Sequence, residues 1–325
     1  MTAFPGADAA RDGAGYVLVG APLDATTTFR PGTRSGPGRV RRFAAPFDDY
    51  DRRTDAAFSA LGVHDAGDVA TWDPAEEYLD HLTAELRAAV IDDAVPLLLG
   101  GEHTVAWAGV RATDPDTLVV LDAHLDLRDR HRGSPLNHAC VTRRALDGPA
   151  DRDIGDGSDG SAEGGDTGAN GEGMEDDGGA NGKGMGADDR ESTDAAHPTA
   201  DAAVVVGART GSRAEWERAD AADVTVVPPA EVGGWLDGLD PGALGDVYLS
   251  VDVDAADPAV APGTGTMEPF GLAARDLRAV VRTLAPRAVG CDVVEVNDRD
   301  DGQAAALGAK LLREFVYAHA DANGR

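Results

Sequence analysis

The chain has 325 residues, enough for one large α/β domain with a sizeable buried core or for two ordinary domains. It carries 58 acidic and 29 basic residues, a formal net charge of −29, and its only lysines are Lys183 and Lys310. This balance argues against a nucleic acid or an anionic membrane as partner, because binding to phosphates requires a basic surface.

The acidic surplus also bears on the environment of the protein. Acid-rich, lysine-poor surfaces suit solubility in concentrated salt, where screening over ~3 Å at 1 M removes the repulsion among like charges. We therefore expect a halophilic source. A local acidic insert is the alternative explanation, but residues 147–200, with 15 acidic and 3 basic residues, contribute only −12 of the net charge.

Cysteine usage and hydropathy predict a cytoplasmic protein. Cys140 and Cys291 lie in unrelated segments and cannot form a disulfide framework. No basic and then apolar leader opens the chain, and no apolar run approaches the ~20 residues of a membrane span. We expect a soluble protein of the cytoplasm.

Short apolar segments alternate with segments of helical character. In chain order we predict a strand at 16–20, a helix at 75–93, a strand at 95–99, a helix at 104–112, a strand at 117–121, a helix at 138–146, a strand at 203–207, a helix at 212–221, strands at 224–227 and 247–251, a helix at 273–284, a strand at 288–294 and a helix at 303–319. The strands are rich in Val and Leu without polar alternation, which is typical of a parallel sheet buried on both faces. The order predicts a three-layer α/β/α sandwich with a mostly parallel central sheet, whose ligands gather at the carboxyl ends of the strands.

Residues 147–200 interrupt this pattern. The segment holds 14 glycines, no aromatic residue, and Ile154 as its only branched aliphatic residue. Such a composition buries too little apolar area to offset the entropy of ordering. We therefore predict a Gly/Asp-rich, disordered surface insert within a single domain that spans residues 1–325. A salt-tuned lid is the alternative.

Acidic and imidazole side chains follow three of the predicted strands. The strand 117–121 is followed by Asp122, His124 and Asp126, whose alternate spacing puts the three side chains on one face. Asp252 and Asp254 follow the strand 247–251 with the same spacing, and Gly100-Gly-Glu-His103 ends the strand 95–99. A lone Asp or His at a strand end is usually a cap, but three such ends at one sheet edge point to a joint role.

Metal ions would resolve the repulsion in this set. Four carboxylates packed together without cations would be forced to protonate. Oxygen ligands with two imidazoles suit Mn²⁺ better than zinc or copper. Six ligating residues are too many for one catalytic ion but fit two ions ~3.5–4 Å apart that share carboxylates.

Three motifs resemble the metal-binding signatures of the ureohydrolase family, which includes arginase, agmatinase and formiminoglutamase. They are GGEH at 100–103, DAHLD at 122–126 and SVDVDAADP at 250–258. The likeness also covers GAPLDATTTFRPGTRSGPGRVR at 20–41, GTGTMEPFGL at 263–272 and VVEVN at 293–297. The chain departs from the usual pattern at Glu102, where many relatives carry Asp, at Met267, and at Asn297-Asp298.

The resemblance implies two Mn²⁺ ions per subunit, although Co²⁺, Ni²⁺ and Fe²⁺ share the ligand preferences. It places His103, Asp122, Asp126 and Asp252 on one ion, and Asp122, His124, Asp252 and Asp254 on the other. Asp122 and Asp252 would bridge. A hydroxide between the ions would be the nucleophile, its pKa lowered by the metals, and Asp126 would orient it.

The resemblance also implies roles for residues around the ions. Glu295 would clamp the substrate guanidinium through a bidentate pairing. His138 would shuttle a proton to the leaving amine, although a simple helix-start role is the alternative. Asn137 joins Glu295 and His138 in the expected substrate-binding set.

The loop after the second signature carries the expectation about the substrate. Arg128 stands where arginases carry Asn, and LDLRD…LNHACVTRR looks like the archaeal and bacterial agmatinase branch. We therefore expect cleavage of agmatine to putrescine and urea, a step in polyamine biosynthesis, in a halophilic archaeon. Arginine, guanidinobutyrate and formiminoglutamate remain alternatives, because Arg128 or Arg130 could pair with a carboxylate.

Two other interpretations are weaker. A deacetylase relative on the same fold would use one zinc and fewer acidic ligands. A catalytically silent, regulatory ureohydrolase-like subunit would have lost a ligand, whereas all six positions are filled here. Family members commonly form trimers or hexamers, so we expect a homo-oligomer.

Overall fold

A parallel sheet forms the centre of the protein. The computed structural model describes residues 3–149, 199–221 and 223–325. Among these residues the main sheet has eight strands in the order β4-β1-β5-β10-β9-β6-β7-β8, and every neighbouring pair is parallel. The strands are β1 (Tyr16–Ala21), β4 (Val63–Asp68), β5 (Val95–Gly100), β6 (Thr117–Leu121), β7 (Ala202–Val206), β8 (Val224–Val227), β9 (Val247–Asp252) and β10 (Ala288–Val294).

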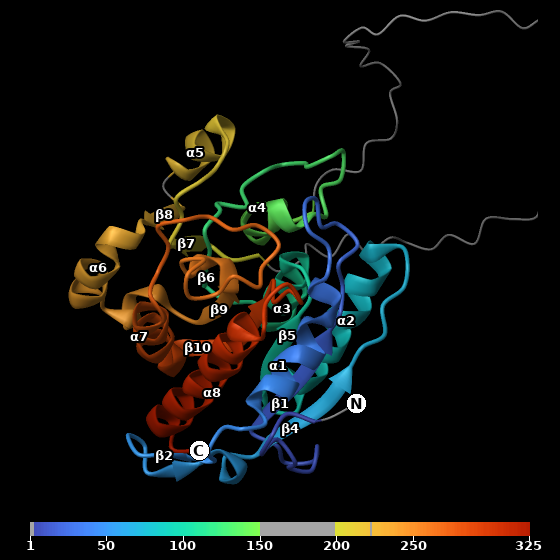
Figure 1. Ribbon diagram of the computed structural model, residues 1–325, viewed down its shortest axis with the longest axis vertical. Coiled ribbons are helices and arrows are strands. Elements are labelled where there is room, and N and C mark those ends of the chain that lie inside the picture. The colour runs from blue at the N-terminus through green and yellow to red at the C-terminus, as the bar shows by residue number, and fades with distance from the viewer. Residues whose placement is uncertain (1–2, 150–198, 222) are drawn as a thin grey trace, which may run out of the picture. The chain divides into compact units, whose positions relative to one another are not determined.

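Helices cover both faces of this sheet. They are α1 (Gly36–Ala44), α2 (Ala75–Ile91), α3 (Ala106–Thr113), α4 (Val141–Asp147), α5 (Arg213–Ala219), α6 (Val232–Gly238), α7 (Ala274–Leu284) and α8 (Gln303–Asn323). Helices α1, α7 and α8 pack side by side on one face, and α2, α3 and α4 pack on the other (Figure 1). The predicted three-layer α/β/α sandwich is confirmed. Among the described residues, none of the helices has the length and apolar composition that crossing a membrane requires.

The central strands of the sheet are largely apolar because each one contributes side chains to two cores. In β5, Leu97 and Leu99 pack into the core beneath α1 and α8, whereas Leu98 packs beneath α2 and α3. Successive side chains of a strand point to opposite faces, so helices on both faces require apolar residues at every position. This arrangement explains the unbroken Val/Leu segments in the sequence.

The edge strand β4 was not predicted, and its side chains explain why. Its sequence, VHDAGD, is too polar to signal a buried strand. Two of its carboxylates instead bind Arg41 of α1, whose Nε lies 2.8 Å from Asp65 Oδ2 and which also pairs with Asp68. All the side-chain atoms of Arg41 are buried. The edge is therefore attached to the helical layer by buried ion pairs rather than by apolar packing.

The segment predicted as an insert lies outside the described residues apart from its two ends. These ends meet. The Ala200 amide donates to the Ala145 carbonyl at 2.8 Å, and a Cβ placed on Gly148 would lie 3.5 Å from Thr199 Cγ2. The described residues that follow α4 and those that precede β7 therefore lie next to each other.

His319 is a buried imidazole on the opposite edge of the sheet from the strand ends that carry the motifs. Its Nδ1 lies 2.9 Å from the Tyr16 hydroxyl, and its ring stacks on Phe315 with centroids 5.8 Å apart. Burial, aided by the charge of Arg325, lowers the pKa of His319 to about 4. The folded protein therefore holds this side chain neutral.

We expect His319 to make the fold sensitive to acid. An unfolded chain protonates His near pH 6.5, so the stability that His319 contributes is present above that pH and is lost as the pH falls to about 4. The loss amounts to about 3 kcal/mol. Denaturant titrations between pH 7 and 4 should show a smaller drop in the free energy of unfolding for His319→Gln than for the wild type. His81→Gln, on the exposed face of α2, is the control and should follow the wild type; equal drops in all three proteins would contradict the prediction.

Candidate metal centre

Four neighbouring strands deliver the candidate residues to one place. Strands β5, β10, β9 and β6 are consecutive in the sheet. His103 follows β5, Glu295 follows β10, Asp252 ends β9, and Asp122 follows β6. Segments that are nearly 200 residues apart in the sequence therefore converge at the carboxyl edge of the sheet, where parallel sheets gather their ligands.

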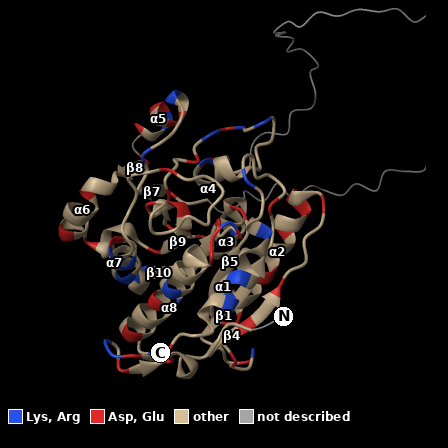
Figure 2. Cartoon of the chain, in the orientation of Figure 1, with Lys and Arg blue, Asp and Glu red and all other residues tan. Residues whose placement is uncertain are grey.

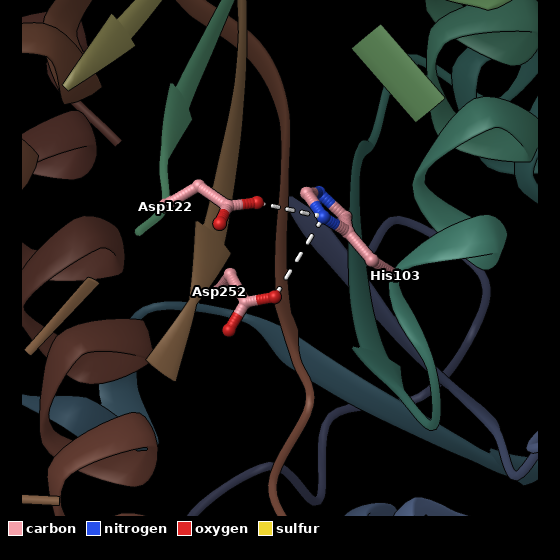
Figure 3. Close-up of side chains that lie close together, drawn as sticks. All are labelled: His103, Asp122 and Asp252. Atoms are coloured by element: carbon pink, nitrogen blue, oxygen red, sulfur yellow. Dashed lines mark ion pairs between the residues drawn. The ribbon is translucent and has the colours of Figure 1, made fainter. Parts of the chain in front are cut away.

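His103 lies at the centre of the first group of side chains. Its Nδ1 is 3.0 Å from Asp122 Oδ2, 2.9 Å from Asp126 Oδ2 and 3.7 Å from Asp252 Oδ2. Figure 3 shows the imidazole of His103 facing the carboxylates of Asp122 and Asp252. All four side chains are buried. One ring nitrogen thus faces three carboxylates.

His124 lies in a second group that shares Asp122 with the first. Its Nδ1 is 3.3 Å from Asp122 Oδ1 and 3.0 Å from Asp254 Oδ2. The two oxygens of Asp122 therefore face different imidazoles, as a bridging carboxylate would. Asp252, the other expected bridge, lies in the first group, and its Oδ1 accepts the Asp254 amide at 2.8 Å.

The state of these groups fits a pair of cations. His103 Nδ1 and Asp122 Oδ2 are buried without a hydrogen-bond partner of acceptable geometry. Burial and the charge of Asp122 raise the pKa of Asp126 to about 7. Burial, with repulsion from Asp254 and Asp122, raises the pKa of Asp252 well above its usual range. Cations among these side chains would satisfy the unpaired atoms and let the carboxylates stay ionised.

Two residues that sequence reasoning missed hold His103 in place. Its Nε2 lies 3.1 Å from Ser250 Oγ, and Ser250 donates to Asp292 Oδ1 at 2.7 Å. Ser250 and Asp292 are opposite each other in β9 and β10. Contacts of this kind fix the orientation and tautomer of a metal-binding imidazole. The sequence does mark both residues, since each is a polar residue within an otherwise apolar strand.

Glu295 lies beside the first group. Its Oε1 accepts the His103 amide at 2.9 Å, and burial, with the nearby charge of Glu102, raises the pKa of Glu295 to about 8. Its φ of 61° falls in the left-handed region, as does the φ of 50° at Asp126. Residues other than glycine rarely adopt this conformation, and such strain concentrates at functional sites.

His138 faces the site from the loop before α4. Its Nε2 lies 3.0 Å from Thr28 Oγ1. Burial, with repulsion from His103 and His124, lowers the pKa of His138 to about 4, so the ring is neutral at pH 7. The neighbouring Asn137 is occupied within the protein. Its Oδ1 accepts the Ala139 amide, and its Nδ2 donates to the Thr26 carbonyl at 3.0 Å. A contact of Asn137 with substrate stays a prediction.

Glu102, one of the departures from the family pattern, anchors the loop that supports His138. The Thr26 amide donates to Glu102 Oε2 at 2.8 Å, the Thr26 hydroxyl donates to Oε1 at 2.7 Å, and the Thr27 hydroxyl donates to Oε2 at 3.2 Å. The Thr26 hydroxyl in turn accepts the His138 amide at 3.1 Å. Glu102 therefore acts on His138 through Thr26, a link that sequence reasoning missed.

Comparison with known proteins agrees with this geometry. The sequence matches the arginase family over residues 14–317. The chain belongs to the arginase family. It is 29% identical to an agmatinase from Pyrococcus horikoshii over 306 residues, 92% of this chain and 90% of that protein. It is 32% identical to a guanidinobutyrase from Pseudomonas aeruginosa over 321 residues, 92% of this chain and 84% of that protein.

A solved structure gives the same result. The agmatine ureohydrolase of Thermoplasma volcanium superposes with a TM-score of 0.79 at 29% identity, covering 100% of this chain and 96% of the other. The parallel sheet and its order of layers are thus those of an arginase-family hydrolase, whose members act on guanidino C–N bonds.

The loop at 127–134 is rich in arginine. Figure 2 shows it as alternating basic and acidic segments above α4. Arg128 Nε lies 3.1 Å from Glu215 Oε2, and its Nη1 lies 2.7 Å from His131 Nδ1. Arg132 Nη2 donates to the Thr28 carbonyl at 3.0 Å, next to the hydroxyl that meets His138. Arg128 therefore already has a carboxylate partner within the protein.

We expect Glu102→Gln to impair turnover more than folding. The amide offers one acceptor oxygen where three donors converge, so the loop that holds Thr26 and His138 loosens. Loss of charge-assisted hydrogen bonds of ~1.5–3 kcal/mol predicts a fall in kcat of about 10- to 100-fold. Glu102→Asp keeps the carboxylate and is the control. Steady-state urea release measures the effect; equal kcat values for Glu102→Gln and the wild type would exclude this role.

Proposed function

We propose that the chain is an agmatinase, which hydrolyses agmatine to putrescine and urea. One observation carries the proposal. Two acid–imidazole groups share Asp122 at the carboxyl edge of the sheet, and the Glu295 carboxylate lies beside them. The agmatinases among the relatives support the choice of substrate.

We further propose that this centre holds two Mn²⁺ ions. His103, Asp122, Asp126 and Asp252 would hold one ion, and Asp122, His124, Asp252 and Asp254 the other. The oxygen-rich donor set favours Mn²⁺, although Co²⁺, Ni²⁺ and Fe²⁺ accept similar ligands. When bound, the two ions supply a nucleophile for hydrolysis at neutral pH.

The protein side chains do the rest of the chemistry. Glu295 binds the guanidinium and holds its carbon in line for attack. Asp126 accepts a hydrogen bond from the nucleophile and so fixes its direction. His138, neutral at pH 7, takes up the proton that the nucleophile loses on attack and delivers it to the departing amine. The Thr28 hydroxyl keeps the ring of His138 facing the site.

The state of Arg128 favours agmatine over guanidino acids. Its guanidinium pairs with Glu215, so it does not present an open cation to a substrate carboxylate. A guanidino acid such as guanidinobutyrate is the second candidate because of the 32% identical guanidinobutyrase. Arg132, which contacts the Thr28 carbonyl, would be its partner.

A substrate panel tests the proposed activity. The enzyme is stripped of metal with a chelator, reloaded with Mn²⁺, and assayed for urea with agmatine, arginine, guanidinobutyrate, guanidinopropionate and formiminoglutamate. We expect agmatine to give the highest kcat/KM, and the chelated enzyme to be inactive. Asp252→Asn should lower turnover at least ~10³-fold, because it removes a charge from the centre. Its circular dichroism should match that of the wild type, since the Oδ1 of an asparagine can still accept the Asp254 amide.

Two results would contradict the proposal. Urea release from no guanidino compound, with metal occupancy confirmed, would exclude a ureohydrolase. Near-normal turnover by Asp252→Asn would exclude the assigned metal ligands. A preference for guanidinobutyrate would leave the proposed reaction standing and show that agmatine is not the preferred substrate.

We propose a halophilic archaeal source, a cytoplasmic location and a homotrimer or homohexamer. The net charge of −29 and the scarcity of lysine support the first, and the likeness to the family supports the last. The same panel, repeated in molar salt and in dilute buffer, reports the salt requirement. Sedimentation velocity reports the number of subunits.

We also propose that the chain is a single ureohydrolase domain, residues 1–325, with a dispensable insert at 147–200. The meeting of its ends beside Ala145 supports this interpretation. Replacing residues 150–198 by a short Gly/Ser linker should change kcat by less than about twofold. The melting temperature should change by no more than about a few degrees. A control linker of the same length placed within the Arg132–Gly133 turn should lower kcat. Loss of turnover on removing 150–198 would support the lid instead.

A further inference from the structure

Arg209, in the loop after β7, is bound to an unusual set of partners. Its guanidinium donates to six backbone carbonyls. They are those of Gly207, Asp254, Ala255, Ala256, Glu268 and Pro269, at distances of 2.7–3.3 Å. The shortest contacts join Nη2 to the Glu268 carbonyl at 2.7 Å and to the Asp254 carbonyl at 2.8 Å. The side chain therefore gathers two separate loops, 254–256 and 268–269, around one cation.

The backbone of the same residue holds a third segment. The amides of Arg209 and Thr210 both donate to the Ala123 carbonyl, at 2.9 and 3.2 Å. Ala123 lies between the candidate ligands Asp122 and His124. Its own amide donates to Asp254 Oδ1 at 3.0 Å. Arg209 thus links the loop that carries Asp122 and His124 to the turn that carries Asp254.

Arginine suits this position, and lysine does not. A guanidinium offers five N–H donors in a fixed plane, whereas an ammonium offers three from a single atom. The surroundings are built closely around the plane. A Cβ placed on Gly271 would lie 2.6 Å from Arg209 Nη2 and 2.6 Å from the carbonyl carbon of Ala256. Glycine at 271 is what lets this loop approach the guanidinium.

The bonds of Arg209 single out one of the two groups of candidate ligands. They hold the Ala123 carbonyl, next to His124, and the Asp254 carbonyl. The side chains of His124 and Asp254 lie 3.0 Å apart. His103 is held by different residues, Ser250 and Asp292. The two halves of the centre therefore have separate supports, one inside the sheet and one in the loops above it.

We propose that Arg209 is a positioning residue that keeps His124 and Asp254 in register and so sets the affinity of the protein for its second Mn²⁺ ion. The inference rests on the proposed two-manganese function. The second ion is the one that His124 and Asp254 would hold. Residues that orient metal ligands typically change metal affinity by 10- to 100-fold when they are replaced. The ion held by His103 keeps its own support.

The test measures metal binding rather than turnover alone. Metal-free wild type, Arg209→Gln and Arg209→Lys are titrated with Mn²⁺ by calorimetry, and the spin coupling between neighbouring Mn²⁺ ions is followed by electron paramagnetic resonance. We expect two ions in the wild type. Arg209→Gln should bind one ion at wild-type affinity and the second about 10- to 100-fold more weakly. At a metal concentration that gives the wild type its spin-coupled signal, this variant should lack the signal. Arg209→Lys should fall between the two.

Arg282→Gln is the matched control. Arg282 of α7 makes two guanidinium hydrogen bonds, to Glu314 of α8 at 2.6 and 3.0 Å, and none to a residue of the candidate centre. This variant should melt at a lower temperature and still bind two ions at wild-type affinity. The rise in melting temperature on adding Mn²⁺ should shrink only in the Arg209 variants.

The outcomes separate the inference from the function on which it rests. Two ions at wild-type affinity in Arg209→Gln, with a melting temperature lowered as in Arg282→Gln, would overturn the inference alone and leave Arg209 a purely structural residue. Should Arg209→Gln fail to fold, the same two measurements on Arg209→Lys decide. A wild type that binds fewer than two Mn²⁺ ions would overturn both the inference and the proposed function.

Discussion

Repulsion among buried carboxylates is the constraint around which the protein is arranged. Asp122, Asp126, Asp252 and Asp254 are buried within reach of two imidazoles. Without cations, burial and repulsion from neighbouring carboxylates raise the pKa values of Asp126 and Asp252. The fold holds these side chains together despite the repulsion. They extend from the carboxyl ends of adjacent parallel strands, and apolar packing on both faces of the sheet keeps those strands in place.

Much of the fold and of the candidate centre was predictable because both depend on local patterns. Strands buried on two faces are continuous apolar segments, and ligands at strand ends keep a spacing of two residues. Strand β4 escaped prediction because Arg41, distant in the sequence, neutralises its acidic residues. The short helices α1 and α6 escaped because glycines and, in α1, a proline lie within them, and their packing on neighbouring helices decides their conformation.

The supports of the centre could be predicted only in part. Ser250 and Asp292 interrupt apolar strands and were visible as anomalies. The roles of Glu102 and Arg209 depend on loops that approach only in the folded chain. A guanidinium bound to six carbonyls leaves no pattern in the sequence, since any residue can supply a carbonyl. Backbone partners are therefore the part of a site that sequence reasoning reaches last.

The close approach of Gly148 and Thr199 has a consequence for how this protein can change over time. When both ends of an added segment leave and enter at one point, its length is nearly uncoupled from the stability of the domain, because each doubling adds only ~0.6 kcal/mol of closure entropy. A change in the length of a segment inserted at this junction would therefore cost the domain little stability. The same junction would accept a foreign domain, such as a fluorescent reporter. The candidate ligands would not be disturbed, because they follow the carboxyl ends of the strands, at the opposite edge of the sheet.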